Sequence, residues 1–153
     1  MHKTAKRSIK PKVSIIGVKP VEVTTYWPLA QFLIREALNY SGKYAEPKHF
    51  YELLLTDQMQ LWIMFGNDEA AQNKMFGICI TRIVDMPNYP QLEIIICTGS
   101  RRDLWEDNLV GDITKFAKEN GCKRLCSWVR PGWERISKKW GWEKKHVQMV
   151  KEL

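Results

Sequence analysis

The run Leu92–Cys97 constrains the fold of this chain more than any other stretch. It is apolar at every position except Glu93, which is typical of a strand that is covered on both faces of a sheet. A turn containing Gly99 follows, and then an amphipathic stretch that ends at Asn120-Gly121. The next apolar run, 122–129, has the composition of a further strand. This region therefore predicts a buried strand, a helix and a second strand in succession.

The turn between that strand and that helix is a candidate anion site. A strand, a turn and a helix N-terminus in this order offer free backbone N–H groups and the positive end of the helix dipole. The candidate residues are Thr98, Gly99, Ser100, Arg101 and Arg102. Asp103 is placed to cap the helix, Glu106 to complete a capping box and Asp107 to add a further carboxylate. The sequence thus predicts a helix N-terminus that its own side chains have already neutralised.

The rest of the chain supplies the other elements. A strand over 13–18 precedes a helix that Thr24 or Thr25 can cap, and a shorter helix follows over 47–55. Two β-rich runs, over 59–65 and 75–84, form a hairpin, and a helix over 132–140 and a strand over 142–150 close the chain. The apolar residues of the first helix fall on one face: Leu29, Phe32, Leu33, Ala37 and Tyr40. The predicted order is strand, two helices, three strands, helix, strand, helix, strand.

Length and composition favour a single domain over residues 13–153, preceded by an arm over residues 1–12. With 153 residues, 44% of them hydrophobic, the chain can bury an ordinary core without disulfides or a structural metal. Its four cysteines form no Cys-x-x-Cys pair, so we expect reduced thiols in the core and no metal site. No stretch has the length of a membrane span, and no secretory signal follows the N-terminus. We therefore expect neither membrane insertion nor secretion by a signal peptide.

The net charge of +7 is concentrated at the two ends of the chain. Residues 1–12 carry +5 and the residues from Gly121 onward carry +6, whereas the middle carries −4. The basic residues of the arm are Lys3, Lys6, Arg7, Lys10 and Lys12. Such a distribution fits an acidic protein surface, a nucleic acid or a phosphorylated cofactor, and it does not separate them.

The segment from Arg130-Pro131-Gly132-Trp133 to Gly141-Trp142, together with the order of elements, resembles the GNAT superfamily of acyl-CoA N-acyltransferases. The combination of Met-Gln-Leu-Trp at 59–62 with Arg-Pro-Gly-Trp is similar to small GNAT-like proteins of bacteriophages and prophages. The resemblance implies a mixed α/β (α+β) architecture, with a twisted sheet that splays between the strand ending at Cys97 and the strand beginning at Cys122. Acyl-CoA would lie in that gap, with its pyrophosphate on the turn after Cys97.

The resemblance also assigns roles to two side chains and shows where the chain departs from the family. Glu93 matches the position of the glutamate that some members use as a base, and Ser137 falls where the family has an acidic tyrosine. The turn Thr98–Asp103 lacks the second and third small residues that let the backbone approach the phosphates. Both the turn that would bind the coenzyme and the position of the catalytic acid therefore depart from the family's pattern.

We weigh three functions. The first is a GNAT-like protein of bacteriophage type that acts as a non-catalytic binding or virion-associated module, with the basic arm contacting another protein, in the host cytoplasm or the virion. The second is an active acetyl-CoA-dependent N-acetyltransferase, with Glu93 as base and Arg101 and Arg102 holding the pyrophosphate. The third is non-specific nucleic-acid binding by the arm.

Overall fold

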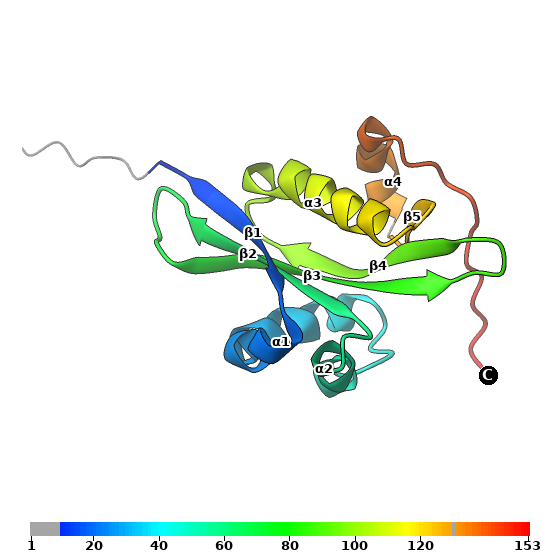
Figure 1. Cartoon of the computed structure of the whole chain (residues 1–153), viewed down its shortest axis with the longest axis horizontal. Coiled ribbons are helices and arrows are strands. Elements are labelled where there is room, and N and C mark those ends of the chain that lie inside the picture. Colours follow the sequence, from blue (N-terminus) through cyan, green and yellow to red (C-terminus); the bar gives the residue numbers. More distant parts are fainter. Residues whose placement is uncertain (1–9, 130) are drawn as a thin grey trace, which may run out of the picture.

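A computed structural model of the chain describes residues 10–129 and 131–153. Its centre is one sheet of five strands in the order β1-β2-β3-β4-β5 (Figure 1). The first four strands form an antiparallel meander, and β5 pairs with β4 in parallel. The strands are β1 (Lys12–Val18), β2 (Gln60–Asn67), β3 (Lys74–Asp85), β4 (Pro90–Gly99) and β5 (Arg124–Ser127).

Helices cover both faces of this sheet. Figure 1 shows α1 and α2 on one face and α3 on the other, with α4 close to α3 beyond β5. The helices are α1 (Val23–Tyr40), α2 (Pro47–Leu55), α3 (Glu106–Glu119) and α4 (Pro131–Ser137), and the short 3-10 turns are η1 (Pro20–Glu22), η2 (Arg102–Leu104) and η3 (Lys138–Trp140). The mixed α/β (α+β) sheet flanked by helices confirms the predicted architecture. Within the described ranges, no helix is both long and apolar enough to cross a membrane.

The two faces hold separate cores, and β4 contributes to both. Leu92 is fully buried in the core beneath α3, and Ile96 is buried in the core beneath α1 and α2. This confirms that the apolar run of β4 is covered on both faces. On α3, the buried stripe is Leu109, Ile113 and Ala117, as the helical spacing predicts.

Several predicted local features are wrong. The first helix, α1, begins at Val23 with Glu22 as its N-cap, so neither Thr24 nor Thr25 caps it. The buried stripe of α1 includes Ala30, Ile34 and Leu38, and the helix leaves Leu29 and Phe32 exposed. Asp103, the predicted start of the helix, lies within the 3-10 turn η2, and α3 starts at Glu106. Residues 142–150, predicted to be a strand, contain none and are mostly exposed.

Candidate functional site

The parallel strands β4 and β5 separate after a short common stretch. They pair only over Gln91–Ile94 and Arg124–Ser127, although β4 continues to Gly99. The last contact is a hydrogen bond of 3.3 Å from Ser127 Oγ to the carbonyl oxygen of Ile94. The remainder of β4 has no parallel neighbour within the described part of the chain, which is the splay that the sequence resemblance implies.

A β-bulge lies at the point of separation. The register of β4 against β3 runs from Ile94 opposite Thr81 directly to Ile96 opposite Ile80, so Ile95 has no partner in β3. A bulge redirects the side chains that follow it. Here it turns Ile96 toward α1 and α2, and it brings the next residue, Cys97, to the face that α3 covers.

The turn after β4 is held tightly against β3. A Cβ atom at Gly99 would lie 2.3 Å from the carbonyl oxygen of Phe76 and 2.5 Å from the Cα atom of Gly77. The amide of Ser100 donates to the same Phe76 oxygen over 2.8 Å, and Trp105 Nε1 donates to the Ser100 carbonyl over 2.8 Å. Only glycine fits this approach at position 99, so the glycine of the turn serves the sheet itself.

Acidic side chains surround Arg101, the next residue of the turn. It has a left-handed backbone with φ of 52°. Its guanidinium donates to Asp103 over 3.2 and 3.1 Å and to Glu69 over 2.7 Å, and Asp68 lies 3.9 Å away. These carboxylates raise the pKa of Arg101, and Arg101 lowers the pKa values of Glu69 and Asp103. The guanidinium is thus already occupied by protein groups.

Arg102 joins the turn to α4. Its guanidinium carbon lies 3.2 Å from the ring centroid of Trp133, and its Nη2 lies 3.5 Å from Glu106 Oε1. Among the described residues, Arg102 Nε is a buried donor with no hydrogen-bond partner. No pattern in the sequence predicts this contact, because Trp133 lies 31 positions after Arg102 in the chain.

The predicted self-capping of the helix is wrong. The N-cap of α3 is Trp105, and no side chain caps it. Asp103 instead binds Arg101, Glu106 pairs with Arg102, and Asp107 Oδ1 accepts a hydrogen bond of 3.0 Å from Trp140 Nε1. The side chains that were expected to cap the helix therefore hold the two arginines and η3.

Glu93, the candidate base, lies on the sheet face opposite α3. Its side chain is only 12% exposed, and its Oε2 accepts a hydrogen bond of 2.9 Å from Arg82 Nε. Its Oε1 lies 3.4 Å from Gln91 Nε2, and Gln91 Oε1 accepts from Arg124 Nε over 2.8 Å. Both carboxylate oxygens are therefore engaged by the protein.

Other predicted groups lie apart from the turn. Ser137 Oγ donates to the carbonyl oxygen of Trp133 over 2.8 Å within α4. Of the arm, Lys3, Lys6 and Arg7 fall outside the described residues. The Lys10 carbonyl accepts a hydrogen bond of 2.8 Å from Asn67 Nδ2, and Lys12 begins β1. The described ranges contain no group of three His, Cys, Asp or Glu side chains that could hold a metal ion.

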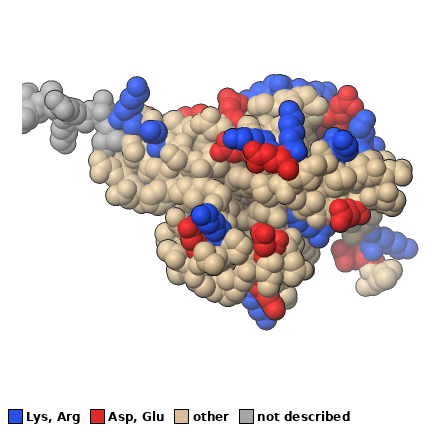
Figure 2. Space-filling view, viewed as in Figure 1, with Lys and Arg blue, Asp and Glu red and all other residues tan. Residues whose placement is uncertain are grey.

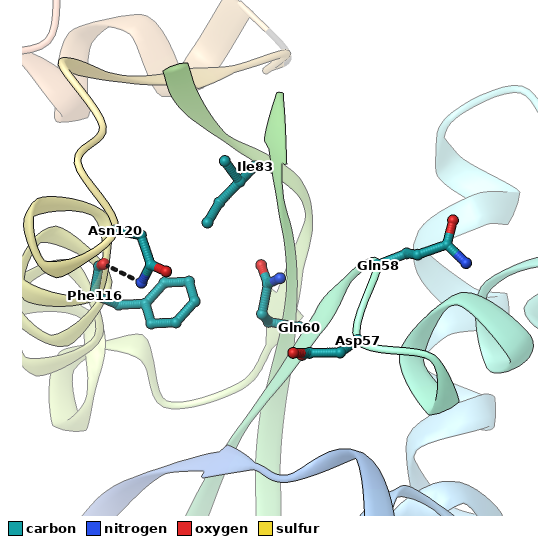
Figure 3. Close-up of a pocket in the computed structure, with 6 residues that line it drawn as sticks. All are labelled: Asp57, Gln58, Gln60, Ile83, Phe116 and Asn120. Carbon is teal, nitrogen blue, oxygen red and sulfur yellow. Dashed lines mark hydrogen bonds between the residues drawn. The ribbon is translucent and has the colours of Figure 1, made fainter. Parts of the chain in front are cut away.

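A pocket that sequence reasoning missed lies at the other end of the sheet. Its volume is about 500 Å³, and Figure 3 shows its side chains on the loop before β2, on β2, on β3 and on α3. The lining residues are Asp57, Gln58, Gln60, Ile83, Phe116 and Asn120. Asn120 Nδ2 is bonded to the carbonyl oxygen of Phe116 over 2.8 Å, and Gln60 Oε1 accepts from Thr81. Because most of its polar groups are amides, the pocket offers no strong nucleophile.

The sequence matches no protein-family model and no curated protein. The structure is nevertheless similar to many solved acetyltransferases. An aminoglycoside acetyltransferase from an uncultured soil metagenomic sample shares 11% identity, with 94% of this chain and 99% of that chain covered at a TM-score of 0.68. A protein described as a predicted acetyltransferase, from Clostridium acetobutylicum and solved with acetyl-CoA, shares 13% identity over 92% and 96% of the two chains at a TM-score of 0.65. At such identities the likeness shows the fold alone.

Proposed function

We propose that this chain, which has the fold of the GNAT acetyltransferases, is a binding protein that does not carry out acyl-CoA-dependent transfer. The observation that carries this proposal is that protein groups occupy both arginines of the coenzyme turn. Arg101 is held by Asp103 and Glu69, and Arg102 is stacked on Trp133. A pyrophosphate would have to displace these partners before either guanidinium could bind it as a fork.

The charge around the turn supports the same conclusion. Four carboxylates lie near the two arginines, those of Asp68, Glu69, Asp103 and Glu106, and Asp107 lies in the first turn of α3. An arriving pyrophosphate would meet these like charges, and those at a helix N-terminus contribute roughly 0.3–1 kcal/mol each. The residues present therefore do not fit the coenzyme's phosphates.

The groups expected to move protons support it as well. Amine acylation needs a base for the nucleophile and often an acid for the leaving thiolate. Glu93 is paired with Arg82 in the sheet, and the Ser137 hydroxyl is bonded to its own helix. The Glu93 carboxylate is therefore not a free proton acceptor, and the Ser137 hydroxyl is not a free proton donor.

Calorimetry with acetyl-CoA tests this proposal. We expect no saturable heat as acetyl-CoA is raised to about 1 mM, which corresponds to a binding free energy weaker than about −4 kcal/mol. Saturation at micromolar acetyl-CoA would contradict it. A useful control is the variant Trp133→Ala, which frees one face of Arg102, so binding that appears only in this variant identifies the stack as the barrier.

The second candidate is an active N-acetyltransferase that uses acetyl-CoA. The separation of β4 from β5 favours it, because the sequence resemblance implies that acyl-CoA lies between these two strands. On this reading Thr98–Arg102 is the pyrophosphate turn and Glu93 is the base. The double variant Arg101→Ala, Arg102→Ala should then lose coenzyme affinity, and unchanged affinity in that variant would exclude the assignment.

The identity of the partner is proposed from charge and from the sequence resemblance. We infer that Lys3, Lys6, Arg7, Lys10 and Lys12 contact an acidic surface of another protein, such as a phage structural protein in the host cytoplasm or the virion. Nucleic acid is the alternative partner for the same charges. Binding that weakens steeply with salt supports phosphate contacts, because counterions are released, whereas salt-insensitive binding counts against nucleic acid.

A further inference from the structure

Two cysteines face each other across the central strands. Cys79 of β3 is the direct register partner of Cys97 of β4, and each thiol affects the pKa of the other. Directly opposite residues of an antiparallel pair have Cα atoms about 4.5–5.5 Å apart, which lies within the roughly 4.4–6.8 Å that a disulfide spans. The backbone therefore already holds both residues at disulfide distance, although both thiols are free.

The two thiols have opposite environments. Cys79 is fully buried, and burial raises the pKa of its thiol. Cys97 is exposed, and the hydrogen bond from Cys79 and the charge of Arg102 lower its pKa, against the opposing effects of desolvation and of Glu106. The accessible sulfur therefore belongs to the more acidic of the two thiols. Reactive cysteines have this electropositive and accessible surrounding.

Arg102 supplies a second, independent observation. Its Nε is a buried donor without a hydrogen-bond partner among the described residues, although its guanidinium touches Trp133 and Glu106. A buried donor of this kind costs free energy unless an acceptor is present. A thiolate at the neighbouring Cys97 is such an acceptor, whereas a neutral thiol is a weak one.

We propose that Cys97 and Cys79 form a peroxide-reactive site, in which Cys97 is oxidised by a hydroperoxide and Cys79 converts the product into a disulfide. The Cys97 thiolate attacks one peroxide oxygen, the O–O bond breaks, and the leaving oxygen takes up a proton to become water or an alcohol. The Cys79 sulfur then attacks the sulfenic acid, the S–O bond breaks, and the hydroxyl leaves as water with the Cys79 proton. The two thiols together lose two electrons to the peroxide. This chemistry needs no acyl-CoA, so it does not depend on the function proposed above.

The test uses the reduced full chain with hydrogen peroxide, followed by alkylation of the remaining thiols and peptide mass spectrometry. We expect a linked pair of peptides containing Cys79 and Cys97, while Cys122 and Cys126 stay alkylated. In Cys79→Ser the sulfenic acid at Cys97 cannot be resolved, so dimedone should label Cys97 in that variant. In Cys97→Ser both the link and the label should be lost.

Two further variants separate chemistry from folding. Cys122→Ser removes a half-buried thiol outside the register pair of Cys79 and Cys97, and it should leave the yield of the linked pair unchanged. Arg102→Met should slow the alkylation of Cys97 by iodoacetamide several-fold, with the rate at Cys122 unaffected. The proposal is overturned if Cys97 in the unaltered chain reacts no faster than Cys122, or if peroxide links the four cysteines without preference for this pair.

Discussion

Arg102 is the residue at which three parts of the chain meet. Its guanidinium lies over Trp133 of α4, pairs with Glu106 of α3 and lies beside the thiol of Cys97 on β4. In the turn that we proposed as the candidate pyrophosphate site, one side chain therefore ties together two helices and a strand. A side chain that holds structure in this way is not free to bind a ligand.

Replacing Trp133 with alanine should destabilise the protein by about 1–2 kcal/mol, because a cation–π contact contributes roughly 0.5–2 kcal/mol when partly desolvated. Urea unfolding followed by circular dichroism measures the change. Trp128→Ala is the matched control, since Trp128 is 63% exposed, and its loss should change stability by less than about 0.5 kcal/mol. Equal losses in the two variants would show that the stack on Arg102 contributes nothing.

The carboxylates around Arg101 predict a dependence of stability on pH. Hydrogen bonds to Arg101 lower the pKa values of Glu69 and Asp103, and the amides of Ala70 and Ala71 lower the pKa of Asp68. A carboxyl with a lowered folded-state pKa stabilises the fold above its unfolded value of about 4, and this contribution is lost as pH falls through the folded value. We expect the urea midpoint to fall on acidification below about pH 4.

The variant Arg101→Gln tests the cause of that dependence. In this variant the loss of stability on acidification should be smaller, because the pKa values of Glu69 and Asp103 are lowered chiefly by Arg101. Asp68 should keep its contribution, since its leading interactions are backbone hydrogen bonds. If the variant and the unaltered chain lose the same stability on acidification, these ion pairs do not stabilise the fold.

Among the elements, the strands and helices of the centre could be predicted because their pattern depends on local spacing. The stripe of α3 and the two-sided burial of β4 follow from periodicity alone. The start of α3 could not be predicted, because Asp103 has a better partner in Arg101 than in the helix amides. That partner depends on the left-handed backbone of Arg101 and on Glu69, which is distant in sequence.

The missing last strand has a different reason. Residues 142–150 alternate in polarity, but a strand also requires a neighbour with which to hydrogen-bond, and β5 offers an edge of only four residues. Val147 and Met149 are 64% and 88% exposed, so the alternation faces solvent rather than a core. Alternation predicts which side chains share a face, and it does not supply the partner strand.

The turn after β4 predicts a strong effect of one methyl group. Gly99→Ala should destabilise the protein by about 2–4 kcal/mol, because its Cβ would lie 2.3 Å from the Phe76 oxygen in the neighbouring strand. The control is Gly111→Ala in α3, where nothing lies within 4 Å and alanine should stabilise by up to about 1 kcal/mol. Thermal unfolding of both variants measures the contrast, and a harmless Gly99→Ala would contradict the tight approach of the turn to β3.

For the whole molecule, the distribution of charge separates the arm from the domain. On the face in Figure 2, basic and acidic side chains are interspersed, so this face shows no single large basic patch. The net charge of +7 arises from the arm and the region from Gly121 onward. Strong attraction to an acidic partner is therefore expected at the arm or at the region from Gly121 onward. Of the arm, Lys3, Lys6 and Arg7 lie outside the described residues.

Neutralising the arm should weaken binding to a polyanion. We expect the full chain with Lys3, Lys6, Arg7, Lys10 and Lys12 changed to glutamine to elute from heparin at lower salt than the unaltered chain. Each lost phosphate-like contact reduces the slope of log K against log salt by about 0.9 on duplex DNA. The control changes Lys138 and Lys139 of η3, which follows α4, to glutamine. If that control has the larger effect, the arm is not the main basic surface.

The bulge at Ile95 shifts the alternation of side chains along β4 by one residue. Before it, one set of alternate positions faces α3, and after it the complementary set does, so Ile94 and Cys97 share a face although three positions separate them. Deleting Ile95 would restore strict alternation and leave Ile96 on the face of α1 and Cys97 on the face of α3. The core beneath α1 would lose one aliphatic side chain, because Ile95 packs against it. The bulge therefore lets two successive isoleucines, Ile95 and Ile96, contribute to the same core while Cys97 stays beside Arg102.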